Sequence, residues 1–146
     1  MENLIFKSVA SLAGQKINRN GNEFTVKKVI PDNEATKCRA NIVEVAPGNY
    51  AYGYHYHEAN EEVFYIISGT GVVRTINGDI EVKAGDVIGF PTGENGAHVI
   101  RNVSKDEKLV YIDFGTMILP EIVHLPDLNK IMVIGKEVNA IYDKQS

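Results

Sequence analysis

The apolar and β-branched residues of this chain come in short runs bounded by turn signals, and this pattern constrains the fold more than any other feature. Asn77-Gly78 lies between two such runs and is a strong two-residue hairpin signal. Many short strands at regular spacing, without an amphipathic helix of useful length, predict an all-β sandwich or barrel. The runs cover residues 24–30, 40–46, 63–67, 72–76, 80–83, 87–90, 98–103 and 109–114.

The two ends of the chain carry weaker patterns than the middle. Residues 1–21 predict only a short N-terminal extension before a barrel of about residues 22–115. After Gly115 the spacing changes, because Pro120 and Pro126 break a tail whose last apolar run covers residues 130–134. We expect this C-terminal extension, residues 116–146, to pack against the outside of the barrel. The 146 residues then form a single domain, residues 1–146.

Charge and composition narrow the classes of partner. The formal net charge is −4, and the chain has no dense run of Lys and Arg. Phosphate binding needs clustered basic side chains, so nucleic acid is not expected as a partner. We expect a small-molecule ligand or substrate instead.

The sequence also favours a cytoplasmic location. Cys38 is the only cysteine, so no intrachain disulfide can form, and a reducing compartment is the default. The N-terminus lacks the basic start and apolar centre of a signal peptide. No stretch approaches the roughly 20 apolar residues of a membrane span. A soluble protein without a membrane partner is the prediction.

A spacing of histidines and a glutamate indicates metal chemistry. His55 and His57 are two residues apart, so in a strand both side chains point to the same face. Glu62 follows a short turn that can fold it back beside them, and His98 must come from another strand. Three imidazoles and one carboxylate suit Fe, Mn, Co, Ni, Cu or Zn. On an octahedral ion these four ligands leave two positions for substrate, water or dioxygen.

Each of these residues also has a simpler interpretation. Two histidines on a strand are often surface or structural residues, and Glu62 alone would be part of a solvated acidic turn. His98 alone would most often be a hydrogen-bonded buried histidine. His124 lies far from the other three in sequence, and we interpret it as non-functional.

Two groups of residues resemble the paired motifs of the cupin family. The resemblance covers about residues 40–115. It implies a double-stranded β-helix, a small jelly-roll-like barrel, in which His55, His57, Glu62 and His98 are the metal ligands. The first group is Gly48, His55, His57, Glu62 and Gly69, and the second is Gly85, Pro91, Gly93, His98 and Asn102.

Two spacings depart from the cupin motifs. The segment between Gly48 and His55 is one residue longer than in the motif, and the segment between Gly93 and His98 is two residues longer. The second insertion leaves open whether Gly93 or Gly96 is the motif glycine. The chain also resembles bacterial single-domain cupins, most of which have no assigned reaction. The resemblance therefore implies a fold and a site but no substrate.

Strand alternation predicts which other residues share a face. If His55 and His57 point inward, the neighbouring tyrosines point outward as one stripe. That stripe is either a subunit interface, which would make the protein a homodimer, or a surface covered by the chain's own terminal segments. Inside, Phe64, Ile66 and Ile100 are expected to give the metal an apolar surround. The tyrosines are Tyr50, Tyr52, Tyr54 and Tyr56.

These expectations lead to two candidate functions. The first is a metal-dependent enzyme of oxygenase or isomerase type, and the alternative is a non-catalytic module that binds or senses a metabolite. No catalytic acid or base is assigned. Glu94 could reach the barrel mouth, although a solvated carboxylate is the simpler role. Tyr111 and Asp113 lie on a late strand that could face the interior.

Overall fold

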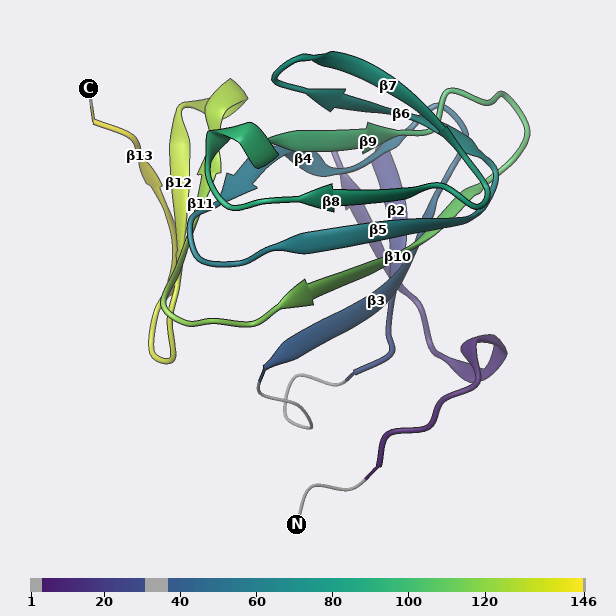
Figure 1. The fold of residues 1–146 in the computed structure, drawn as a ribbon, viewed down its shortest axis with the longest axis horizontal. Coiled ribbons are helices and arrows are strands. Elements are labelled where there is room, and N and C mark those ends of the chain that lie inside the picture. Colours follow the sequence, from purple (N-terminus) through teal and green to yellow (C-terminus); the bar gives the residue numbers. More distant parts are fainter. Residues whose placement is uncertain (1–3, 31–36, 146) are drawn as a thin grey trace.

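The computed structural model describes residues 4–30 and 37–145, which form two antiparallel sheets that face one another (Figure 1). The chain is all-β, with the double-stranded β-helix topology that the cupin resemblance implied. The first sheet contains, in spatial order, β1 (Gln15–Arg19), β2 (Asn22–Lys28), β3 (Cys38–Val45), β10 (Leu109–Thr116), β5 (Glu62–Ser68) and β8 (Val87–Phe90). The second contains β13 (Asn139–Asp143), β12 (Lys130–Ile134), β11 (Glu121–Leu125), β4 (Tyr50–His57), β9 (His98–Arg101), β6 (Thr70–Thr75) and β7 (Gly78–Lys83).

Short 3-10 turns complete the described part of the chain: η1 (Val9–Ser11), η2 (Glu94–Gly96) and η3 (Pro126–Leu128). Within residues 4–30 and 37–145, no helix has the length and apolar character that crossing a membrane requires. Each predicted run overlaps one strand. The strands β1, β11 and β13 were not predicted, because β1 and β13 are mostly exposed and β11 begins with a buried glutamate.

The inward residues of the two sheets meet in one apolar core. Phe64 and Ile66 of β5 and Ile100 of β9 are all buried. The ring centroid of Phe64 lies 5.3 Å from that of His98, so the prediction that the apolar residues share the histidines' face is confirmed. Burying one such side chain contributes about 1.5–3 kcal/mol, and this term holds the facing sheets together.

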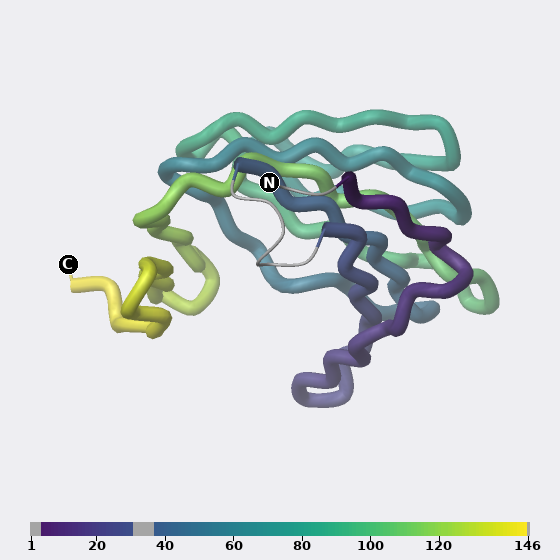
Figure 2. The backbone as a smooth tube through the Cα atoms, turned by 90° about the horizontal axis from the view of Figure 1, so that it is seen from below, coloured from purple at the N-terminus to yellow at the C-terminus, as the bar shows by residue number. Residues whose placement is uncertain are grey.

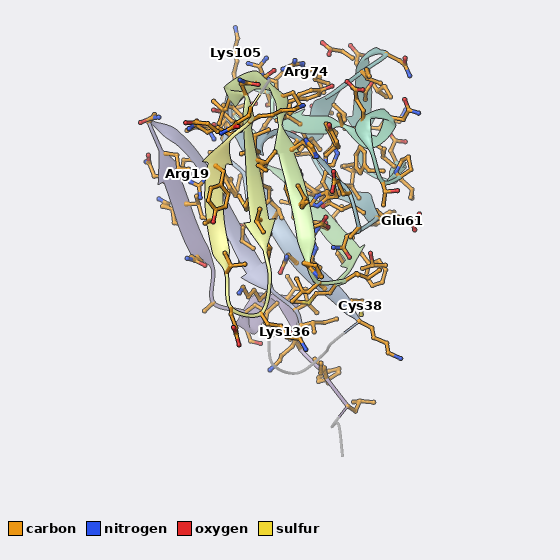
Figure 3. The ribbon with its side chains drawn as sticks, turned by 90° about the vertical axis from the view of Figure 1, so that its left-hand side faces the viewer. Arg19, Cys38, Glu61, Arg74, Lys105 and Lys136 are labelled. Atoms are coloured by element: carbon orange, nitrogen blue, oxygen red, sulfur yellow. The ribbon has the colours of Figure 1, made fainter. Side chains whose placement is uncertain are left out.

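The C-terminal extension continues the second sheet beyond β4. Strand β11 pairs with the end of β4, where Val123 lies opposite His57, and β12 and β13 follow in antiparallel order. Figure 2 shows these yellow strands beside the barrel. On the side drawn in Figure 3, the guanidinium of Arg74 in β6 donates two hydrogen bonds to Asp127 of η3, at 2.6 and 3.0 Å.

Two tyrosines of β4 are covered by residues of the same chain. The Arg74 guanidinium lies 3.9 Å from the ring centroid of Tyr54. The ring of Tyr56 stacks on His124 of β11, with centroids 4.4 Å apart. These contacts correspond to the second interpretation of the stripe, a surface covered by the chain itself.

Tyr52 contradicts the predicted outward stripe. Its ring centroid lies 4.8 Å from that of Phe24, a core residue, and 6.5 Å from that of His55. The alternation fails because the register of β4 against β9 shifts between Ala51 and His55, and Tyr52 has φ 66°. The four tyrosines therefore do not form one outer surface, and the homodimer stays a prediction without that support.

Glu121 fastens the turn that joins β4 to β5. Its carboxylate is buried, and it accepts a hydrogen bond from the side-chain amide of Asn60. The turn leads from His57 to Glu62, so this carboxylate fixes the spacing of two candidate metal ligands. Three backbone N–H groups also donate to it, from Glu58, Ala59 and Ile122 at 3.2, 2.9 and 2.9 Å.

The substitution Glu121→Gln should destabilise the protein. The amide keeps one oxygen for the three backbone N–H groups but turns its NH2 toward the side-chain NH2 of Asn60, and an unsatisfied buried donor costs about 1–3 kcal/mol. We expect the free energy of unfolding, measured by urea denaturation, to fall by about 2 kcal/mol. The same change at exposed Glu61 is the control. Equal urea midpoints for the two variants would contradict this role.

Candidate metal centre

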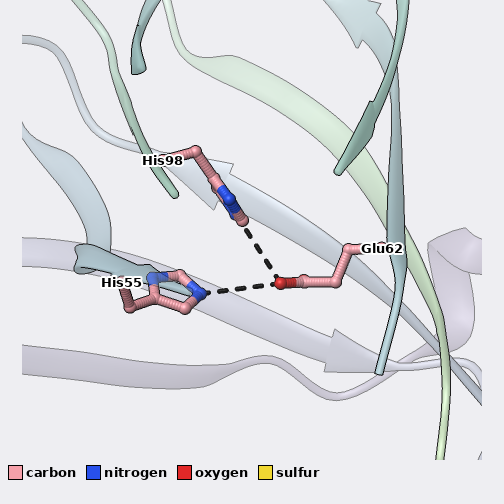
Figure 4. Close-up of side chains that lie close together, drawn as sticks. All are labelled: His55, Glu62 and His98. Carbon is pink, nitrogen blue, oxygen red and sulfur yellow. Dashed lines mark ion pairs between the residues drawn. The ribbon is translucent and has the colours of Figure 1, made fainter. Parts of the chain in front are cut away.

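Strand pairing brings three of the predicted ligands together. His55 of β4 lies directly opposite His98 of β9, and Glu62 begins β5 in the facing sheet. One ligand atom from each lies within 4.8 Å of the others, and Figure 4 shows all three side chains converging. Among the described residues, these three side chains form the group of histidine and acidic residues that could hold a metal ion.

The imidazoles converge on one oxygen of Glu62. The Oε1 atom lies 3.5 Å from His55 Nε2 and 3.6 Å from His98 Nε2. His57 lies outside the compact group of three, but its Nε2 approaches the same Oε1 to 2.5 Å. All three imidazoles therefore approach the same oxygen of Glu62.

Hydrogen bonds at Nδ1 orient two of the imidazoles. His55 Nδ1 lies 2.6 Å from the carbonyl oxygen of Gly53, and His98 Nδ1 lies 2.8 Å from that of Gly96. A carbonyl oxygen only accepts, so each Nδ1 carries a proton, and in the neutral ring Nε2 keeps its lone pair. Both lone pairs face the centre, which is the orientation of a metal-binding histidine.

Burial sets the protonation of the centre. Burial and, after it, the neighbouring His55 lower the pKa of His98 to about 4, so His98 is neutral near pH 7. Burial alone would raise the pKa of Glu62. Contacts with His55 and His57 and the charge of Arg39 instead hold that pKa well below its usual range. Neutral imidazoles beside an ionised carboxylate are the forms that bind metal.

Arg39 supports Glu62 from the neighbouring strands and was not predicted from the sequence. Arg39, Gly115 and Glu62 lie in one row across β3, β10 and β5. Gly115 has no side chain, and a Cβ there would lie 3.2 Å from Arg39 Nε, so the guanidinium can cross above it. It binds Glu62 Oε2 at 2.8 Å, which leaves Oε1 for the imidazoles. Arg39 is four residues before the inward-facing Val43 on the same strand, and this even spacing could have identified Arg39 as an inward-facing residue.

Asp113 and Tyr111 of β10 complete the polar interior. Both face inward and are buried, at 1% and 0% exposure. Arg39 donates a hydrogen bond to Asp113 Oδ2 at 3.3 Å. Burial and the nearby Glu62 raise the pKa of Asp113 well above its usual range. Glu94, by contrast, lies on η2 and is exposed.

The polar atoms at the centre fit a divalent transition metal. His98 Nε2 is buried and makes no hydrogen bond among the described residues, whereas His57 Nε2 lies 2.5 Å from Glu62 Oε1. Buried polar atoms are usually satisfied, so the unpaired Nε2 of His98 indicates a missing partner. Imidazole nitrogen and carboxylate oxygen are the ligands that such ions prefer.

Comparisons with known proteins place this centre in a wider context. An oxalate-binding protein from Thermotoga maritima is 35% identical over 65 residues. That match covers 44% of this chain and 51% of the relative, so the chain aligns with about half of the relative's length.

Solved structures share the architecture. A sugar phosphate isomerase from a cupin superfamily, from Silicibacter pomeroyi, has a TM-score of 0.84 and 19% identity over 94% of this chain and 91% of that one. The polyketide cyclase RemF from Streptomyces resistomycificus has a TM-score of 0.66 and 21% identity over 80% of this chain and 83% of that one. At these identities the likeness shows the fold alone.

A family model for the cupin domain matches residues 41–115. The matched segment is about half of the chain, and it runs from β3 to β10. It contains the three histidines and the glutamate of the centre as well as Gly115. This chain belongs to the cupin family.

Proposed function

We propose that this chain is a metal-dependent cupin enzyme of oxygenase or isomerase type that acts on a small molecule. His55, His57, Glu62 and His98 would hold one divalent transition metal, which is Fe, Mn, Co, Ni, Cu or Zn. The fold, the family and the compact group of His55, Glu62 and His98 support this proposal.

One observation carries the proposal. The Nε2 lone pairs of His55 and His98 face the ionised Glu62 Oε1 at 3.5 and 3.6 Å. In the neutral form of His98, its Nε2 lone pair and the carboxylate oxygen are both acceptors, so these two atoms repel one another unless a cation lies between them. The Nδ1–H···O=C bonds prevent the two rings from simply reversing their donor and acceptor sides. A divalent ion converts this repulsion into coordination.

The residues around the centre define what it can do. When bound, the metal supplies Lewis-acid polarisation of a substrate oxygen. His98 packs face to face on Phe90, with ring centroids 3.6 Å apart, and edge-on against Phe64, so that side of the centre excludes water. Tyr52 is 42% exposed beside His55 and forms the side open to a ligand.

The alternative is a module that binds a metabolite without converting it. The oxalate-binding relative from Thermotoga maritima favours this alternative. A ligand that raises the midpoint of thermal unfolding of the metal-loaded protein and is recovered unchanged would support it. Consumption of dioxygen, or isomerisation of a carbonyl compound, at a rate abolished by chelation would support the enzyme.

The metal site can be tested directly by titration. The wild-type protein should bind one equivalent of Co²⁺ or Zn²⁺, and a free concentration of 100 Kd should stabilise it by about 2.7 kcal/mol. His98→Gln removes one ligand and should weaken binding by at least about 100-fold, more than loss of a group that merely supports a ligand. Isothermal titration calorimetry and metal analysis measure both quantities.

The matched control is His124→Gln, because His124 stacks on Tyr56 outside the centre. That variant should bind metal as the wild type does. If the wild-type protein took up no divalent transition metal, the proposal would be wrong. Equal affinities of the His98 and His124 variants would show that the ion binds elsewhere.

Stability of the metal-free protein should fall between pH 7 and pH 5. The pKa of His98 is about 4 in the fold against 6.5 in the unfolded chain. Between about pH 6.5 and pH 4, His98 is therefore protonated in the unfolded chain but not in the folded protein. This difference predicts a loss of about 2 kcal/mol between pH 7 and pH 5.

Urea denaturation across this range, with a chelator present, measures the slope. The His98→Asn variant should lose most of the pH dependence, since it has no imidazole to protonate at this position. Parallel curves for the wild-type and His98→Asn proteins would contradict the buried, neutral state of His98.

A further inference from the structure

Three features of the barrel interior cost stability and are not needed to hold a metal. They are the hydroxyl of Tyr111, one oxygen of Asp113 and the backbone of Tyr52. Tyr111 and Asp113 lie on β10, where Asp113 contacts Arg39, and Tyr52 lies beside His55.

Tyr111 and Asp113 each present a buried polar atom without a partner. Tyr111 Oη and Asp113 Oδ1 make no hydrogen bond among the described residues, although the two side chains are 0% and 1% exposed. Arg39 occupies only the other oxygen of Asp113. A desolvated polar atom left unpaired costs about 1–3 kcal/mol. Two such atoms on neighbouring inward positions of β10 indicate a shared missing partner.

Tyr52 is held inward by an unfavourable backbone conformation. Its φ of 66° lies in the left-handed region, which bulky side chains rarely adopt. The other positive-φ residues besides glycine in the described part of the chain are Asn20 and Asn129, a residue type that tolerates this region. Strain of this kind is typical of ligand-binding sites, where the surrounding structure holds it in place.

The three side chains gather around Asp113. Burial raises the pKa of Tyr52 to about 12, and Asp113 is the next cause. Burial and then Asp113 likewise raise the pKa of Tyr111 well above its usual range. Tyr111 and Asp113 are also two residues apart on β10 and both buried, so their side chains share the inward face of that strand. The Tyr52 ring centroid is 6.5 Å from that of His55, so the group borders the metal centre.

We propose that Tyr52, Tyr111 and Asp113 form a ligand-binding subsite for a hydroxyl group of a small polyoxygenated molecule. The ligand hydroxyl donates to Asp113 Oδ1 and accepts from Tyr111 O–H, which satisfies both unpaired atoms at once. A hydroxyl both donates and accepts, so it fits Asp113 Oδ1 whether or not that carboxyl carries a proton. The ligand's adjacent oxygen reaches the metal, and this last point rests on the proposed function.

The first test needs no ligand. If the Tyr111 hydroxyl has no partner in the free protein, Tyr111→Phe removes a desolvated group and leaves the packing intact. The midpoint of thermal unfolding should then equal or exceed that of the wild type. Tyr65→Phe is the matched control, because Tyr65 is 44% exposed on the outer face of β5. A midpoint more than about 2 °C below this control would mean that the hydroxyl already has a partner, such as an ordered water, and would overturn the subsite.

The second test uses ligand pairs that differ in hydroxyl groups. Zn²⁺-loaded protein is titrated with glycolate against acetate, D-glycerate against propionate, and D-ribose against 2-deoxy-D-ribose. At least one hydroxylated member should bind more tightly than its partner. Tyr111→Phe should lose about tenfold in affinity for it, as expected for one hydrogen bond, while Tyr65→Phe should not.

The outcomes separate the subsite from the metal centre. Equal affinity of the Tyr111→Phe and Tyr65→Phe proteins, or no preference for any hydroxylated probe, would overturn the subsite. Failure of the wild type to take up Zn²⁺ would overturn the proposed function, while the thermal comparison of Tyr111→Phe with Tyr65→Phe would still decide on the subsite.

Discussion

The carboxylate of Glu62 is the contact on which the polar interior of this barrel depends. Its two oxygens have different partners, because Oε1 faces the imidazoles and Oε2 binds Arg39 at 2.8 Å. A carboxylate that is only 3% exposed requires such partners, since a buried unpaired charge costs several kcal/mol. Glu62 lies in one sheet, and the histidines lie in the other. The contact therefore links the two sheets as well as organising the centre, and any change in their relative position alters the candidate ligand set.

Strand register gives this contact its geometry. The row Arg39, Gly115 and Glu62 works because the middle strand contributes no side chain, so an arginine two strands away reaches the carboxylate. Shifting β10 by one residue would put Phe114 or Thr116 in this row and block the guanidinium. Glu121 acts in the same way from the other sheet, because it ties the turn before Glu62 to β11. The centre is thus positioned by pairings on both sides.

Short-range spacing and strand alternation were sufficient for the all-β fold and for placing Glu62 near His55. That His98, distant in sequence, joins them was implied by the resemblance to the cupin motifs and not by spacing. Alternation failed for Tyr52, since it assumes a regular strand and the register of β4 shifts between Ala51 and His55. The extra residue between Gly48 and His55 was visible in the sequence. The register shift of β4 in the same segment was not. The partnership of Arg39 with Glu62 depends on pairing between strands distant in sequence, which no local pattern contains.

The apolar core explains how the barrel can hold so many polar groups. Val43, Val45 and Leu109 are fully buried around the polar cluster, and each contributes about 1.5–3 kcal/mol. Two unpaired atoms at about 1–3 kcal/mol each would remove a large share of a typical net stability of 5–15 kcal/mol. An apolar interior on the same strands would avoid this cost. Groups this costly would be satisfied by a partner from outside the chain, and the candidate metal centre borders them through Glu62 and Arg39.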